Sequence, residues 1–260
     1  MPDSLRLAVG TLTALRVPAP RTVNRVTARN AMLMAPLVGF AIGILAEVAA
    51  ATTRVAIPGY SDRFLVAVVG VGTLAVLTRG MHLDGLADTA DGLGSGKHGQ
   101  PALDIMRRSD IGAFGVITLV LVLLLQISAL TTALLVGRGT LALIGGAVVA
   151  RLAITWTCRR GVPAARTDGL GWVVANNIRP IAALAVTAGV SALLVLGVWW
   201  DDDVHWRFAV NVLVAMVAAL VVSQLLVQRT VKRWGGVTGD VMGATAEVAF
   251  TVFVVIVSFG

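Results

Sequence analysis

Long apolar runs separated by short polar segments make up most of the sequence. A helix that crosses a membrane needs about 20 mostly apolar residues, and none of the runs shows the strict alternation of barrel strands. The candidate spans are residues 31–52, 64–81, 111–136, 139–157, 180–200, 208–228 and 241–259. The pattern predicts an all-α, polytopic membrane helix bundle with about seven transmembrane helices. Span 64–81 is the weakest, because its apolar core is short and Arg79 lies inside its end.

The first apolar stretch, Leu5 to Leu15, is too short and too polar to be a further span. Arg6 interrupts it, and Arg16 and two prolines follow it. These features favour an N-terminal amphipathic helix that lies at the membrane interface.

The composition supports a membrane protein. Hydrophobic residues make up 57% of the chain, the mean hydropathy is +0.87, and only 13% of the residues are charged. Soluble domains carry about 25% charged residues. Too few polar residues remain to cover a globular surface, so we expect residues 1–260 to form a single integral membrane domain in the lipid bilayer.

The distribution of basic residues predicts the orientation. The net charge of +7 is spread between the apolar runs instead of over one soluble face, which argues against nucleic-acid binding. If the N-terminus is cytoplasmic, 16 of the 21 Lys and Arg residues fall in inside segments, namely 1–30, 79–110, 158–179 and 229–240. The positive-inside rule favours this orientation.

Inside segment 79–110 carries an acidic cluster. Asp84, Asp88 and Asp91 stand at i, i+4 and i+7, which places them within about 60° of one another on a helix. Three carboxylates on one face repel unless a cation offsets them, and hard oxygen ligands suit Mg²⁺, Mn²⁺ or Ca²⁺. The alternative is a solvated helix face at the membrane surface. His82 beside the cluster is a metal ligand, a base or a hydrogen-bonding partner.

Basic residues in the same segment are candidates for phosphate contacts. Lys97 ends a glycine-rich turn that lacks the spacing of a P-loop. Arg107 and Arg108 precede a span beside Asp110, where they suit a diphosphate and the remainder of a metal shell. Ordinary basic anchoring at the membrane surface is the alternative.

Two charged residues, Arg151 and Glu247, lie inside predicted spans. Charges within a membrane are costly and are usually paired or functional. We expect both to face one cavity near the cytoplasmic ends of their helices, and we hypothesise that they pair. Two inside loops add Arg166, and Thr238 with Asp240, as candidates for binding substrate or metal.

Several ordered motifs resemble the adenosylcobinamide-GDP ribazoletransferase (cobalamin synthase) family. The most diagnostic is HLDGLADTADGL at residues 82–93, followed by IMRRSDIGAFG at 105–115 and GGVTGDVMGA at 235–244. Residues 15–20 and 35–39 resemble the N-terminal pattern of the family, so the resemblance covers most of the chain.

This resemblance implies a Mg²⁺-dependent transferase of cobalamin (vitamin B12) biosynthesis in the bacterial cell membrane, with its active site facing the cytoplasm. Such enzymes join adenosylcobinamide-GDP to α-ribazole or its 5′-phosphate, release GMP, and form adenosylcobalamin or its phosphate. Composition and spacing by themselves do not indicate a corrinoid. The sequence leaves both a monomer and a homo-oligomer open.

The expected catalytic residues are His82, Asp84, Asp88, Asp91 and Asp110, of which Asp84, Asp88 and Asp91 are the expected metal ligands. The expected substrate-binding residues are Lys97, Arg107, Arg108, Arg151, Arg166, Thr238, Asp240 and Glu247.

Three other functions fit parts of the sequence. Residues 88–92 match the start of the CDP-alcohol phosphotransferase motif, but its following Ala-Arg and its second aspartate pair are missing. Asp84 and Asp88 also have the spacing of a membrane prenyltransferase motif, without its partner motif. A transporter would use Arg151 and Glu247 along a path, but the chain shows no inverted repeat.

Overall fold

The protein is built from helices, and no β-strand occurs among the residues that the computed structural model describes, which are 1–56, 63–199 and 206–259. In chain order the helices are α1 (Asp3–Leu12), α2 (Arg25–Leu33), α3 (Ala35–Ala56), α4 (Arg63–Leu77), α5 (Met81–Gly94), α6 (Gln100–Ile105), α7 (Ala113–Leu135), α8 (Gly139–Thr157), α9 (Gly169–Val174), α10 (Pro180–Trp199), α11 (Trp206–Trp234) and α12 (Gly239–Phe259).

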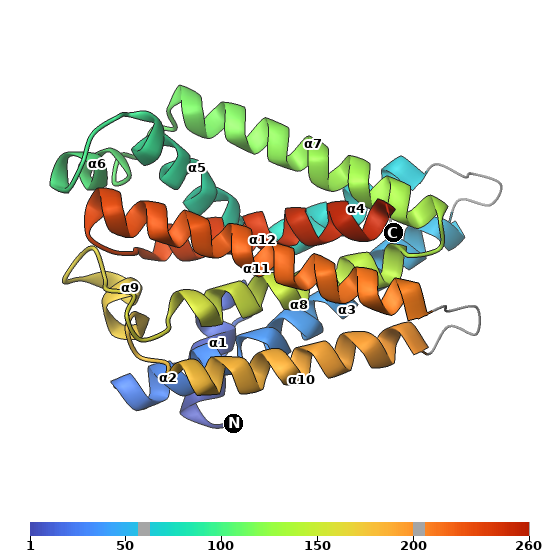
Figure 1. The fold of residues 1–260 in the computed structure, drawn as a ribbon, viewed down its shortest axis with the longest axis horizontal. Coiled ribbons are helices and arrows are strands. Elements are labelled where there is room, and N and C mark those ends of the chain that lie inside the picture. The colour runs from blue at the N-terminus through green and yellow to red at the C-terminus, as the bar shows by residue number, and fades with distance from the viewer. Residues whose placement is uncertain (57–62, 200–205, 260) are drawn as a thin grey trace.

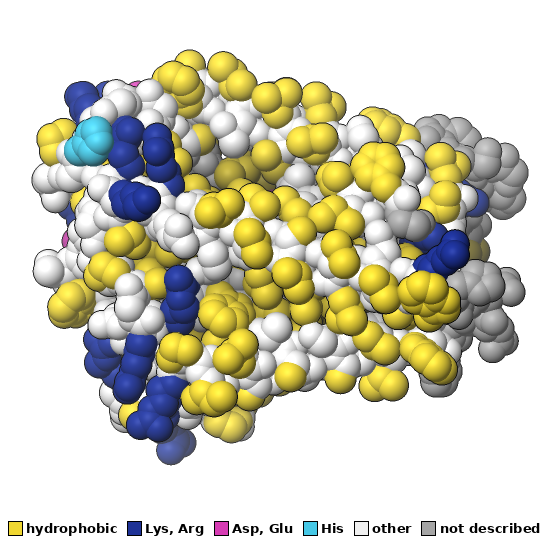
Figure 2. Space-filling model, viewed as in Figure 1, with side chains coloured by type: hydrophobic (Ala, Val, Ile, Leu, Met, Phe, Trp, Pro, Cys, Tyr) yellow, Lys and Arg dark blue, Asp and Glu magenta, His cyan; other side chains and the backbone are white. Residues whose placement is uncertain are grey.

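The long helices run side by side along the long axis of the molecule (Figure 1). Among the described residues, six helices are long and apolar enough to cross a membrane, namely α3, α7, α8, α10, α11 and α12. The short helices α5, α6 and α9 lie together at one end of this bundle. Lys and Arg side chains gather at that end, whereas hydrophobic side chains cover the visible flank of the bundle (Figure 2). We call the end of the bundle that carries α5, α6 and α9 the basic end. The predicted multi-pass all-α bundle is confirmed.

The weakest predicted span, 64–81, is broken. Helix α4 has only 15 residues, and α5 continues after a bend of 87°. Arg79 and Gly80 both adopt positive φ angles, 53° and 68°, at the break. The Gly80 N–H donates to the Ala75 carbonyl at 2.8 Å, which ends α4. The acidic segment thus begins a new helix at the basic end.

Helices α8 and α12 form the centre of the bundle, and α8 packs against α3, α10, α11 and α12. Glycines allow the close contacts. A Cβ atom at Gly39 of α3 would collide with the backbone carbonyl of Ala147 in α8, and one at Gly146 of α8 would lie 2.8 Å from the ring of Phe250 in α12. Small residues at helix interfaces are typical of membrane bundles, where packing rather than burial from water drives association.

The N-terminal amphipathic helix is present as α1. Its apolar residues Leu7, Ala8 and Leu12 are buried, and α1 packs against α2 and α3. The chain then passes α4, where the Ala14 N–H donates to the Leu77 carbonyl. Helix α1 therefore packs on the outside of the bundle near the basic end.

Most predicted boundaries agree with the observed helices within a few residues. The span predicted at 139–157 is α8, and the last residue of span 180–200 lies outside the described residues. Span 208–228 is longer than predicted, because α11 continues to Trp234 and carries Lys232 and Arg233 in its last turn. Basic side chains suit a helix C-terminus, so the loss of hydropathy there does not end the helix.

Gly39→Ala should destabilise the bundle, because the added methyl group meets the Ala147 carbonyl at the contact between α3 and α8. Overpacking of this kind costs about 1–3 kcal/mol. The thermal unfolding midpoint of the purified protein in detergent should fall. Gly72→Ala is the matched control, since a Cβ atom at Gly72 of α4 meets nothing within 4 Å. Equal midpoints for the two variants would contradict the packing argument.

Candidate active site

Helix α5 carries the three predicted carboxylates and lies between α7 and α12. Glycines bring α5 and α12 unusually close together. A Cβ atom at Gly85 would lie 2.6 Å from the Asp240 carbonyl oxygen, and one at Gly243 would lie 3.0 Å from the Cα atom of His82. The first turn of α12, with Asp240, is therefore held against the first turns of α5.

The carboxylates of two distant segments meet as a result. Asp240, Asp84 and Asp91 all repel the negative charge of Asp88. Asp84 is exposed and Asp88 is partly buried. The sequence predicted the cluster on α5, but one acidic neighbour of Asp88, Asp240, comes from α12.

One arginine opposes this negative charge. Arg166 Nη1 lies 3.7 Å from Asp240 Oδ2, and Arg166 Nη2 donates to the Leu103 carbonyl at 2.8 Å. The Thr238 hydroxyl donates to Asp240 Oδ2 at 3.1 Å. Thr238, Asp240 and Arg166, which the sequence assigned to substrate binding, therefore form one polar group joined by a hydrogen bond and an ion pair.

The loop of Arg166 is joined to the loop before α12 by backbone hydrogen bonds. The Ala165 N–H donates to the Val237 carbonyl, and the Val237 N–H donates to the Pro163 carbonyl, each at 2.9 Å. A Cβ atom at Gly236 would lie 2.5 Å from the Pro163 carbonyl oxygen. Gly236 of the 235–244 motif thus permits the backbone contact that places Arg166.

Two cavities open around this group. The larger, about 490 Å³, is polar and is lined by Arg107, Arg166, Asp168, Gly169, Gly171, Trp172, Val237, Thr238, Gly239 and Asp240. The smaller, about 240 Å³, includes Thr11 of α1, His82, Asp84 and Gly243 in its lining. Gly239 and Asp240 line both cavities, so the start of α12 is their common wall.

Asp91 has a different role from its two neighbours. It is buried, its Oδ2 accepts the Gly112 N–H at 2.7 Å, and its Oδ1 accepts the Gly115 N–H at 2.9 Å. These are free backbone donors at the N-terminus of α7, where an acidic side chain is favourable. A Cβ atom at Gly115 would lie 2.6 Å from the Asp91 carboxylate, which explains the glycines of the second motif.

The remaining basic candidates are exposed, and only Arg107 among them lines a cavity. Arg107 pairs with Asp168 at 2.8 Å, and both side chains are largely exposed, so the pair contributes little stability. Asp168 was not among the predicted site residues, and only its place beside the arginines in an inside loop could have indicated it. Lys97, Arg108 and Asp110 are exposed residues of the segment between α5 and α7, and they do not line either cavity.

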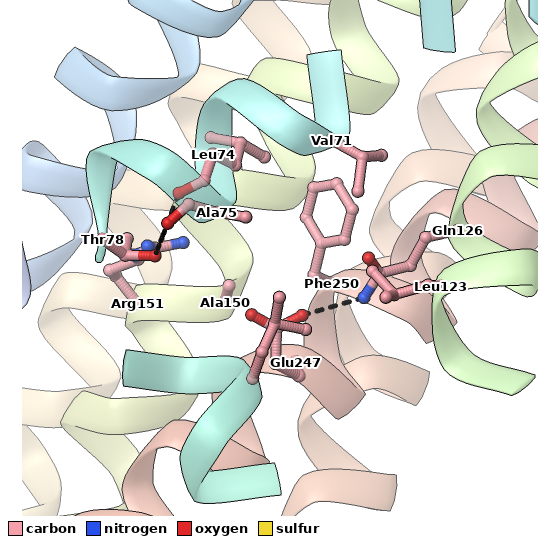
Figure 3. Close-up of a pocket in the computed structure, with 11 residues that line it drawn as sticks. Val71, Leu74, Ala75, Thr78, Leu123, Gln126, Ala150, Arg151, Glu247 and Phe250 are labelled. Atoms are coloured by element: carbon pink, nitrogen blue, oxygen red, sulfur yellow. Dashed lines mark hydrogen bonds between the residues drawn. The ribbon is translucent and has the colours of Figure 1, made fainter. Parts of the chain in front are cut away.

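Arg151 and Glu247 line one small cavity together with Gln126, as Figure 3 shows. The described residues contain no direct ion pair between them. Arg151 Nη2 contacts His82 Nδ1 at 3.2 Å, and Glu247 Oε2 accepts a hydrogen bond from Gln126 at 2.9 Å. The predicted shared cavity is confirmed, but the predicted pairing is wrong at the level of direct contact, because each group has a different hydrogen-bond partner.

The donor set around Asp88 is compatible with Mg²⁺. No group of three or more His, Cys, Asp or Glu in the described part of the chain is arranged to hold a metal ion by itself. However, Mg²⁺ is commonly held by one or two carboxylates together with substrate phosphates. Asp84 and Asp88 are accessible carboxylates of this kind, whereas both oxygens of Asp91 are engaged by backbone N–H groups.

Comparison with known proteins identifies the family. Residues 4–258 match the family described as Cobalamin-5-phosphate synthase. An adenosylcobinamide-GDP ribazoletransferase from Frankia casuarinae is 43% identical over 249 residues, which cover 94% of this chain and 90% of that protein. One of the same name from a Nocardioides species is 41% identical over 253 residues, covering 96% and 95% of the two chains. No solved structure matches.

The chain belongs to the cobalamin-5-phosphate synthase family. It is therefore an enzyme, a transferase of cobalamin biosynthesis. In this cobalamin-5-phosphate synthase family member, the three quoted motifs lie on α5, on the segment from α6 into α7, and on the turn from α11 into α12. All three meet at the basic end of the bundle.

Asp91→Asn should destabilise the protein, because an amide NH₂ would face one of the two N–H donors that the carboxylate now accepts. Leaving a buried donor unpaired costs about 1–3 kcal/mol. The thermal unfolding midpoint in detergent should fall. Asp84→Asn is the control, because Asp84 is exposed, and its midpoint should match the unmodified protein. An unchanged midpoint for Asp91→Asn would show that the bonds to α7 contribute nothing.

Proposed function

We propose that the protein joins adenosylcobinamide-GDP to α-ribazole or its 5′-phosphate, releases GMP, and does so with Mg²⁺. The observation that carries the proposal is that Asp240 lines two neighbouring cavities. Asp240 separates a cavity of about 490 Å³ that contains Arg107 and Arg166 from a cavity of about 240 Å³ that contains Asp84 among mostly apolar residues. A transferase that brings a diphosphate and an acceptor hydroxyl together needs two adjoining sites of these kinds.

The larger cavity suits the diphosphate and the guanosine end of the activated substrate. Arg166 and Arg107 line it, and guanidinium groups bind phosphate oxygens through paired hydrogen bonds. Because the Arg107–Asp168 pair is exposed, Arg107 can exchange its carboxylate partner for a phosphate at small cost.

The smaller cavity suits the ribazole hydroxyl that attacks the phosphorus. Attack forms the new P–O bond, the P–O–P bond breaks, and GMP leaves with its electron pair. The hydroxyl proton must pass to a base in the cavity, and Asp84 and Asp240 are carboxylates that line it.

Mg²⁺ bound by Asp84 and Asp88 would neutralise the diphosphate and the departing phosphate. The mutual repulsion of Asp84, Asp88 and Asp240 supports this assignment, and Arg166 is a positive charge that opposes it.

The direct test is an assay of the purified protein with adenosylcobinamide-GDP and α-ribazole, with and without Mg²⁺, that follows GMP. Release of GMP should require both substrates, stop in excess EDTA, and resume when Mg²⁺ is added. Release of CMP from a CDP-alcohol, or uptake of ligand into sealed vesicles without chemical change, would replace this proposal with a rival one.

Asp88→Asn should lower kcat by at least about 100-fold, since the carboxylate is proposed to hold the cation that stabilises the transition state. Thermal stability should stay near that of the unmodified protein, because no hydrogen bond of the described residues depends on the Asp88 side chain. Initial rates of GMP release measure the effect. Normal turnover by a folded Asp88→Asn enzyme would remove Asp88 from the mechanism.

We also propose that the basic end faces the cytoplasm of a bacterial cell. The positive-inside rule supports this orientation. The single natural cysteine, Cys158, is fully buried, so an added cysteine can report the topology. Lys97→Cys should react with an impermeant thiol reagent in inverted membrane vesicles. Arg207→Cys, at the opposite end of the bundle, should react with the same reagent in right-side-out vesicles. The reverse pattern would place the site outside.

A further inference from the structure

The contact between Arg151 and His82 determines which ring nitrogen of His82 carries a proton. Arg151 Nη2 lies 3.2 Å from His82 Nδ1, and both side chains are buried. A guanidinium group has donors and no acceptor. Nδ1 must therefore accept, which it can do only without a proton. The ring is then neutral, and its single proton is on Nε2.

Arg151 is held in place for this contact. Its side chain is 4% exposed and projects from the second half of α8 into the bundle. Glu247 of α12 interacts with it electrostatically across a cavity of about 20 Å³. This volume is close to that of one water molecule, which needs polar partners of the kind that Arg151, Glu247 and Gln126 provide. Glu247 thus balances the charge of Arg151 without taking the hydrogen bond that His82 receives.

The other nitrogen of His82, Nε2, is the one left for a ligand. Among the described residues, Nε2 makes no hydrogen bond. It is also not one of their buried polar atoms that lack a partner, so it is not fully enclosed. His82 lines the cavity of about 240 Å³ that also contains Asp84 and Asp240. Nε2–H is therefore available to a ligand in this cavity.

We propose that His82 acts as a hydrogen-bond donor, through Nε2–H, to a phosphate or hydroxyl oxygen of the substrate in this cavity, and that Arg151 is the positioning residue that fixes this tautomer. This inference rests on the proposed function for the identity of the ligand. It removes His82 from the candidate bases, because Nδ1 is occupied by Arg151 and Nε2 already carries the proton. The proton of the attacking hydroxyl then passes to a carboxylate, Asp84 or Asp240.

Two isosteric variants separate a donor from a base. In His82→Gln the side-chain NH₂ lies near the place of Nε2 and can still donate. In His82→Asn the side chain reaches only the place of Nδ1. A donor role predicts that His82→Gln keeps kcat for GMP release within about 10-fold of the unmodified enzyme, while His82→Asn and His82→Ala lose about 100-fold or more, as expected for loss of a transition-state donor. If His82→Gln is folded and as inactive as His82→Ala, the donor role is wrong.

Nitrogen NMR tests the tautomer without any substrate. The chain has three histidines, His82, His98 and His205, so ring-¹⁵N-labelled protein in nanodiscs gives few signals, and His82→Gln assigns those of His82. We expect a protonated Nε2 and an unprotonated Nδ1. Arg151→Met should turn this into a mixture of both tautomers. Gln126→Leu is the matched control, since Gln126 lines the same small cavity without contacting His82, and it should leave the signals unchanged.

The two readouts separate the possible failures. An Nδ1-protonated or doubly protonated His82 in the unmodified protein overturns the inference, as does a tautomer that is unaffected by Arg151→Met. If GMP release fails in every variant and in the unmodified protein while the tautomer behaves as expected, the proposed function is wrong and the Arg151–His82 contact stands.

Discussion

The close packing of α5 against the first turns of α12 determines where the acidic side chains of the candidate site lie. Gly85 and Gly243 have no side chains, so the backbones of the two helices approach to a distance that a single methyl group would prevent. Helix α5 comes to this position because the chain turns through 87° after α4. Without that turn, the carboxylates would continue along the axis of α4, away from Asp240 and from Arg166.

The resulting cluster has an imbalance of charge that bears on its function. Asp84, Asp88 and Asp240 repel one another, and Arg166 is the basic group in range of Asp88 among the described residues. Natural proteins seldom keep such a surplus of one sign at a partly buried site without a ligand that offsets it. A divalent cation and a diphosphate would offset it together, since the cation satisfies the carboxylates and the arginines satisfy the phosphates.

Deeper in the bundle, Arg151 and Glu247 each have a hydrogen-bond partner. Gln126 donates to both Glu247 and Thr251, and Arg151 donates to His82. Within a membrane bundle these contacts replace hydration that the surroundings do not supply. The network also connects the apolar interior to the site, because His82 belongs both to the network and to the lining of the smaller cavity.

The sequence by itself determined the helices that can span a membrane, because apolar length is a local property of the chain. It also determined that Asp84 and Asp88 share one side of a helix, since helical periodicity requires only neighbouring residues. The sequence indicated the bend at Arg79 and Gly80 only through the weakness of span 64–81. A left-handed backbone conformation at a residue such as Arg79 has no clear signature in the local sequence.

Only the tertiary structure decided what each side chain meets. Asp91 has the same spacing as Asp88, yet it is bonded to the N-terminus of α7, 21 and 24 residues further along. Asp240 joins the cluster from a different helix, and Arg151 meets His82 across 69 residues instead of pairing directly with Glu247. Such contacts depend on how distant helices pack, and the sequence near each residue does not specify which distant residue it will contact.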